Sequence, residues 1–136
     1  MTFQFDQRHV LYGKLRPYLN KVALPFSSGR CTTEMIPLLP CEGIDRIFLA
    51  WLLRRQETVE FAMQGKTGSR MPRADMDSLL MLKIPLSTFP QQKRIVALIS
   101  EQIAAVEKAR IAAEAELKAI NTLPAALLRR AFNGEL

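Results

Sequence analysis

The chain has 136 residues, of which 49% are hydrophobic, and it carries a formal net charge of +6. These totals predict one modest domain with an appendage and exclude a disordered tail. No apolar run reaches the ~18 residues of a membrane span, and the first residues form no apolar signal core, so we expect a cytoplasmic protein that does not enter a membrane. The two cysteines, Cys31 and Cys41, form no Cys-x-x-Cys pair and are expected to be reduced.

Short strand and helix patterns fill the first 88 residues. Strands are indicated by β-branched and aromatic runs between Gly- and Pro-containing turns, and helices by N-caps and apolar periodicity. The predicted elements are, in chain order, strands over 9–12, 22–26 and 31–39, a helix from its N-cap Asp45 through Arg55, a helix over 57–64, a helical turn over 75–80 and a strand over 81–84.

Basic residues gather in two stretches that contain no acid. The first stretch, from Gln7 to Thr33, holds Arg8, Lys14, Arg16, Lys21 and Arg30, and the second, from Gln64 to Ala74, holds Lys66, Arg70 and Arg73. Because an acidic, apolar segment separates them, the stretches predict one electropositive face of the kind that contacts phosphates. On charge alone, an ordinary basic surface that serves solubility explains the pattern equally well.

Gly65 to Arg73 is the most loop-like of the basic segments. Its two glycines let the backbone approach a ligand closely. Gly65-Lys66-Thr67 resembles part of a P-loop, but no glycine stands five residues before Lys66, and the segment follows a predicted helix rather than a strand. Nucleotide binding is therefore excluded.

A long amphipathic helix is predicted from Gln91 to Asn121. Thr88 and Gln91 have the spacing of a capping box, and Pro124 is expected to end the helix region and open a short helix over 125–132. The apolar side chains recur about every 3.6 residues, so they share one face, which needs a partner helix. The residues expected to pair are Ile95, Ile99, Ile103, Val106, Ala113, Leu117 and Ile120.

The residue patterns of known catalytic centres are missing. The one histidine, His9, has no metal-ligating residues at suitable spacing, and no Gly-x-Ser-x-Gly occurs. Asp75 and Asp77 lie close together, but no Glu-x-Lys follows to complete a two-metal nuclease site. We infer a binding module with no catalytic or metal-ligating residues.

Four sequence blocks, in this order, resemble the specificity subunit of type I restriction–modification systems. They are VLYGKLRPYLNKV at 10–22, CTTE at 31–34, IPL at 84–86 with QKRIV at 92–96, and LLRRAFNGEL at 127–136. Members of that family carry two target-recognition domains, each followed by a long helix, and the two helices pair antiparallel. The resemblance implies part of one DNA-binding recognition domain over 1–88 and one helix scaffold over 89–136. The expected fold class is α+β, with a small mixed α/β lobe, a long helix and a short terminal helix.

The resemblance also implies a function and partners. The expected function is non-catalytic, sequence-specific DNA recognition, with double-stranded DNA, a methyltransferase subunit, a restriction subunit and a second specificity chain or copy as partners. No cofactor is expected on this chain, because S-adenosylmethionine, ATP and Mg²⁺ would serve adenine methylation and DNA cleavage on the partner subunits. The alternative is a truncated protein–protein module that pairs through its helix with another specificity or methyltransferase subunit and does not read DNA.

Charge and flexibility then select the candidate DNA contacts. We expect Lys14, Arg16, Lys21 and Arg30 to lie near phosphates. The loop is the candidate for base edges, because an arginine that binds guanine with two hydrogen bonds gives about 1–3 kcal/mol of discrimination. The loop candidates are Lys66, Thr67, Ser69, Arg70 and Arg73.

Overall fold

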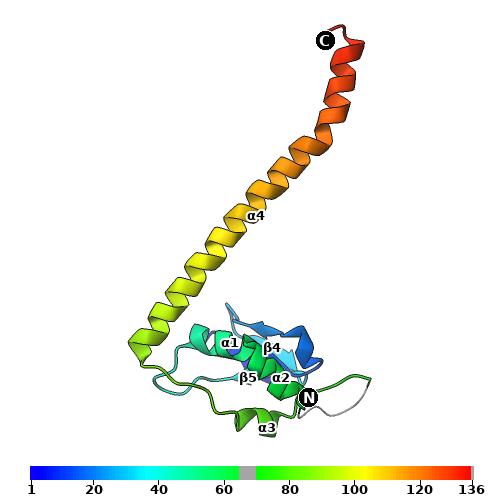
Figure 1. Cartoon of the computed structure of the whole chain (residues 1–136). Helices are drawn as coiled ribbons and strands as arrows, with labels where there is room; N and C mark the ends of the chain where they lie inside the picture. The colour runs from blue at the N-terminus through cyan, green and yellow to red at the C-terminus, as the bar shows by residue number, and fades with distance from the viewer. Residues whose placement is uncertain (65–69, 136) are drawn as a thin grey trace. The chain divides into compact units, whose positions relative to one another are not determined.

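A computed structural model describes residues 1–64 and 70–135 of the chain (Figure 1). Contacts divide the chain into two compact units, Met1–Val96 and Ala97–Leu136, called here the first and second units. The functional boundary predicted between residues 88 and 89 stays a prediction. The loop candidates Lys66, Thr67 and Ser69 lie outside the described residues.

Two small antiparallel sheets form the β part of the first unit. β1 (Thr2–Phe5) pairs with β4 (Gly29–Thr32), and β2 (Val10–Gly13) lies between β3 (Val22–Ala23) and β5 (Met35–Leu38). Because both faces of β2 are covered, all of its residues are buried. The sheets and the helices together confirm the α+β fold class.

Two strand predictions differ from the structure, and one strand of the structure has no counterpart among the predictions. The strand predicted over 31–39 is two strands, since a turn at Thr33 and Glu34 sends β4 to one sheet and β5 to the other. β1 was not predicted. The strand predicted over 81–84 is wrong: in the described part of the chain this segment joins no sheet, and its apolar side chains Leu82 and Ile84 pack instead against two separate clusters of the core.

Three short helices complete the first unit, and local capping explains where two of them begin. Asp45 accepts hydrogen bonds from the N–H groups of Ile47 and Phe48, at 2.9 Å each, which confirms the predicted N-cap. Asp75 caps the next-to-last helix of the chain in the same way. The helices are α1 (Arg46–Arg54), α2 (Gln56–Gln64) and α3 (Met76–Leu80), and a single 3₁₀ turn, η1, spans Pro17–Leu19.

The last helix, α4 (Phe89–Phe132), is longer than predicted and has no break at Pro124. The separate terminal helix is therefore wrong. Proline lacks one helical N–H and crowds the preceding turn, which costs about 3 kcal/mol, but the alanines and leucines around it favour helix enough to continue through it. At the other end, the Gln91 side chain accepts from the Thr88 N–H at 3.1 Å, which is one half of the predicted capping box. No helix in the described residues is long and apolar enough to cross a membrane.

Candidate nucleic-acid interface

Two basic segments far apart in the sequence lie side by side in the first unit. The Arg16 N–H donates to the Pro72 carbonyl at 2.7 Å, and the Ala74 N–H donates to the Lys14 carbonyl at 2.9 Å, so residues 14–16 run antiparallel to 72–74. The Gly13 N–H donates to the Lys21 carbonyl at 2.8 Å. Main-chain hydrogen bonds therefore bring Lys14, Arg16, Lys21 and Arg73 into one region, as a shared electropositive face requires.

Arg16 has an unusual backbone conformation at the centre of this region. Its φ of 52° and ψ of 71° lie in the left-handed region, which costs a residue with a Cβ atom about 1–2 kcal/mol. Asn20 closes the turn with a φ of 48°, and its side chain donates to the Arg54 carbonyl at 2.9 Å. The Arg16 Nε is buried and has no hydrogen-bond partner among the described residues. Strain and an unsatisfied donor at one basic residue are features that concentrate at functional sites.

Carboxylates also lie in this region. The Arg73 Nε donates to both carboxylate oxygens of Glu34, at 3.0 and 3.1 Å. Glu34 lies in the turn between β4 and β5. Both side chains are partly exposed, so the pair contributes only about 0–1 kcal/mol to stability. Arg70, the other described candidate of the loop, is exposed. The face is positive overall but not free of acids.

Arg30 lies apart from the other candidates, on β4. Its Nε donates to the Thr2 hydroxyl at 2.9 Å, and its side chain lines a hollow of about 500 Å³ together with Asp6 and His9. The structure thus places Arg30 with a different set of residues from Lys14, Arg16 and Lys21.

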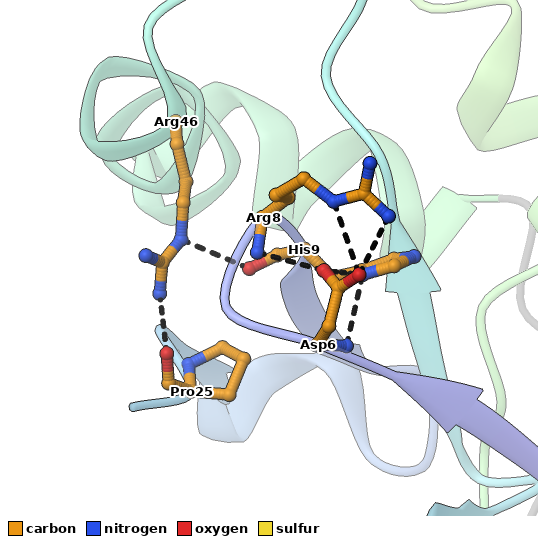
Figure 2. A network of polar contacts seen from close by, with 5 residues as sticks. All are labelled: Asp6, Arg8, His9, Pro25 and Arg46. Atoms are coloured by element: carbon orange, nitrogen blue, oxygen red, sulfur yellow. Dashed lines mark hydrogen bonds and ion pairs between the residues drawn. The ribbon is translucent and has the colours of Figure 1, made fainter. Parts of the chain in front are cut away.

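Figure 2 shows the polar network beside that hollow. The Arg8 guanidinium donates to Asp6 Oδ2 from Nε at 3.0 Å and from Nη2 at 2.6 Å, and His9 Nδ1 lies 2.9 Å from Asp6 Oδ1. Hydrogen bonds from the Arg8 side chain and N–H hold the pKa of the Asp6 carboxyl well below its usual range. Arg46 donates to the carbonyls of His9, at 3.0 Å, and Pro25, at 2.8 Å, and so ties two loops to α1.

The sequence reasoning passed over both of these arginines. Arg8 stood in the first acid-free stretch but was not selected as a contact. Arg46 follows an N-cap, where a basic residue has no expected role, and only the folded chain shows that it bridges two loops.

A second missed feature ties the first turns of α4 into the first unit. Gln92 is fully buried; its Oε1 accepts from the Asp45 N–H at 2.8 Å, and its Nε2 donates to the carbonyls of Gly43 and Ser87 at 2.9 Å each. Lys93 Nζ lies 2.6 Å from Asp45 Oδ2. Burial raises the pKa of the Asp45 carboxyl, but hydrogen bonds from Lys93 and from the Phe48 and Ile47 N–H groups outweigh it, so this pKa lies below its usual value.

The residues predicted to pair lie along α4, and most are exposed. Exposed fractions are 48% for Ile103, 67% for Val106, 58% for Leu117 and 59% for Ile120. Ile95 and Ala113 are also exposed, and Ile99 is half-buried. Because the helix continues past Pro124, it carries further exposed apolar residues beyond the predicted end at Asn121, namely Leu123, Leu127, Leu128 and Phe132. Pairing itself stays a prediction.

Metal ligation has no candidate site in the described parts of the chain, where no group of three or more His, Cys, Asp or Glu side chains is placed to hold an ion. Arginine and lysine side chains of the first unit can form hydrogen bonds and ion pairs with a partner, and exposed apolar side chains of α4 can pack against one. Both are means of binding.

Comparison with known proteins supports the resemblance found in the sequence. No protein-family model matches the chain. The chain spans only 30% of the length of the curated relative that it matches, but that match covers 98% of the chain. Over 134 residues the chain is 28% identical, and therefore similar, to the type I restriction enzyme EcoDI specificity subunit of Escherichia coli.

Proposed function

We propose that this chain is a DNA-recognition component of a type I restriction–modification system. The observation that carries the proposal is the similarity, along 98% of the chain, to a type I specificity subunit. The folded chain supports it independently, because main-chain hydrogen bonds join the two basic segments that were expected to contact phosphates.

Phosphate contact is the role of the basic face. Lys14, Arg16 and Lys21 neutralise backbone phosphates and thereby set the position of the first unit on the duplex. The Arg16 N–H donates a hydrogen bond to the Pro72 carbonyl, so the backbone that carries the Arg16 side chain is held in place. The predicted loop contributes base contacts through Arg70 and Arg73, and Arg30 makes a separate phosphate contact from β4.

Catalysis belongs to partner subunits in this proposal. A methyltransferase subunit that uses S-adenosylmethionine modifies adenine, and a restriction subunit cleaves DNA with ATP and Mg²⁺. The exposed apolar residues of α4 pair with a second copy of the helix or with the helix of another specificity subunit.

Salt-dependent DNA binding tests the proposal. We expect the chain to bind a mixed pool of fluorescent duplexes at about 50 mM salt, with log K falling linearly with log salt. Replacing Lys14, Arg16 and Lys21 by Gln should reduce that slope by about 2.7, since each phosphate contact contributes about 0.9. The matched control also replaces three residues by Gln, namely the exposed lysines Lys83, Lys108 and Lys118, which lie outside the face.

The two triple variants change the net charge equally, so only a localised interface separates them. Equal slopes for both variants would show that the basic face is not the binding surface. Failure of the chain to bind any duplex at about 50 mM salt, alone or with the methyltransferase subunit, would overturn the DNA proposal.

A protein–protein module is the second candidate function. The exposed apolar residues along α4 favour it, because a contiguous exposed stripe of this kind marks an interaction surface. In this case the helix docks on another specificity or methyltransferase subunit, and the first unit does not read DNA. Charge reversal at Lys66, Arg70 and Arg73 separates the candidates: unchanged complex assembly and unchanged DNA affinity would favour the module.

A further inference from the structure

An apolar pocket opens on the surface of the first unit. Its volume is about 200 Å³, and apart from Cys41 and Thr58 all of its lining residues are apolar. The Thr58 hydroxyl donates to the Leu52 carbonyl at 2.8 Å, so its hydrogen is already used within the fold. Leu39 and Leu80 line the pocket and are exposed to solvent. The pocket therefore suits an apolar group that enters from outside the first unit.

The volume of the pocket suits an aromatic ring. An apolar protein cavity of about 150 Å³ is large enough to bind benzene, so this pocket has room for the side chain of a phenylalanine. Such a side chain is present near the C-terminal end of α4, where Phe132 is 89% exposed. An exposed ring and an open apolar pocket both gain by leaving water.

The pocket adjoins the start of α4. Leu52 and Ile84 line the pocket, and they also belong to the apolar cluster in which Phe48 and Val96 pack. Val96 lies in the first turns of α4, within the first unit. A second helix that pairs with α4 along its whole length therefore brings one of its ends close to the pocket.

The direction of pairing decides which end arrives there. Exposed apolar residues run along α4 from Ile95 to Phe132, so pairing over the full length buries most of them. In an antiparallel pair, Phe132 of one copy lies opposite Ile95 of the other, beside its first unit. In a parallel pair, Arg129 and Arg130 would face their own copies, and the two first units would crowd one end of helices that lie about 10 Å apart. The antiparallel direction is favoured on both counts.

Charge at the rim of the pocket also suits the end of α4. Residues 38–45 supply one wall of the pocket and contain the exposed Glu42 but no lysine or arginine. Arg129 and Arg130 come just before Phe132 in the chain. We propose that Phe132 of a second copy fills the pocket, so that each copy of a two-fold dimer places the end of its α4 on the first unit of the other. The inference rests on the pairing of α4 in the proposed function and adds a second contact to it.

Disulfide trapping between two different chains tests the inference, because Cys41 lines the pocket and is exposed. The pocket chain carries Cys31→Ser and keeps Cys41. The tail chain, which differs in mass, carries Cys31→Ser, Cys41→Ser and Asn133→Cys, and so keeps Phe132. When the two full-length chains are mixed and oxidised, we expect a disulfide that joins one chain of each kind.

The matched control for trapping moves the new cysteine to the middle of α4. Ala113→Cys takes the place of Asn133→Cys in the tail chain and is also exposed. It should give little of the mixed product, since two cysteines whose Cα atoms lie more than about 7 Å apart cannot be bridged without backbone movement. Equal trapping at the two positions would overturn the inference.

Sedimentation equilibrium compares two exposed phenylalanines. Phe132→Ala should raise the Kd of self-association by at least about tenfold, because a two-fold dimer loses two buried rings. Phe26→Ala removes a ring that is equally exposed on the first unit and should change the Kd by less than about threefold. A larger effect of Phe26→Ala than of Phe132→Ala would contradict the assignment of Phe132 to the pocket.

Failure of this inference looks different from failure of the helix pairing on which it rests. Disulfides between two tail chains, without any link to Cys41, would indicate parallel helices, which overturns the pocket contact and leaves the pairing standing. A wild-type chain that is monomeric at micromolar concentration would overturn both. DNA binding is decided separately by the salt titration.

Discussion

Gln92 offers the sharpest test of how the first unit is held together. Replacement by Leu keeps the side chain's approximate size but removes the partner of the buried Asp45 N–H and of two carbonyls. A buried polar group that loses its partner costs about 1–3 kcal/mol, and the Asp45 N–H is such a group. The carbonyls of exposed Gly43 and half-buried Ser87 can bond to water instead and add less. We therefore expect the free energy of unfolding to fall by about 2–4 kcal/mol in total. That is a large part of the roughly 5–15 kcal/mol that stabilises a domain.

Fluorescence of Trp51, the one tryptophan of the chain, reports the unfolding of the first unit. In a thermal melt, Gln92→Leu should lower the midpoint by about 10–25 °C, at about 4–8 °C per kcal/mol for a unit of this size. The control is Gln102→Leu, at an exposed position of the same helix, which should change stability by less than about 0.5 kcal/mol. A midpoint for Gln92→Leu within 2–3 °C of the control, roughly half a kcal/mol, would refute the assigned role of the buried amide.

Three further predictions follow from other contacts. Folding lowers the pKa of Asp45, so its ion pair with Lys93 stabilises the fold above the unfolded pKa of about 3.9, and this stability is lost as pH falls through the folded pKa. In urea titrations, the free energy of unfolding of Asp45→Asn should therefore fall less steeply with decreasing pH than that of the wild type. Arg46→Ala should cost about 1–3 kcal/mol and speed hydrogen exchange in the two loops that it bridges, whereas unchanged exchange would contradict the bridge. Ile103→Asp with Leu117→Asp should abolish self-association in sedimentation experiments, and a wild-type chain that is monomeric at micromolar concentration would contradict the pairing role of α4.

Local chemistry explains which parts of the fold the sequence could predict. The cap at Asp45 and the half capping box at Gln91 depend on groups within three residues of one another, so the sequence predicts them directly. The amphipathic pattern of α4 is equally local. The break predicted at Pro124 is wrong because the prediction considered the cost of proline in a helix but not the helix propensity of the residues on both sides of it.

Long-range pairing explains most of what was missed. β1 pairs with a strand almost thirty residues away, and nothing near residues 2–5 indicates that partner. The segment 81–84 has the composition of a strand, but composition cannot provide a neighbouring strand. Gln92 shows the same limit in another form, because a polar residue on an amphipathic helix is expected to face water, and only the surrounding loops make it a buried hydrogen-bonding centre.

The candidate interface divides along the same line. Counting charges located the two basic stretches, because acid-free runs are visible in the sequence. The antiparallel contact of residues 14–16 with 72–74 depends on the folded chain, as does the pairing of Arg73 with Glu34. The positions of the basic side chains could be predicted from the sequence, but the residues that contact each of them could not.

The left-handed backbone of Arg16 places stability and binding in opposition at one residue. Glycine at this position would adopt the same conformation without strain and would remove the buried Nε that has no partner among the described residues, so the Arg16→Gly chain should be the more stable one. It would also carry one positive charge fewer on the proposed DNA face. A search for thermostable variants would therefore select, at this site, chains that bind nucleic acid less well.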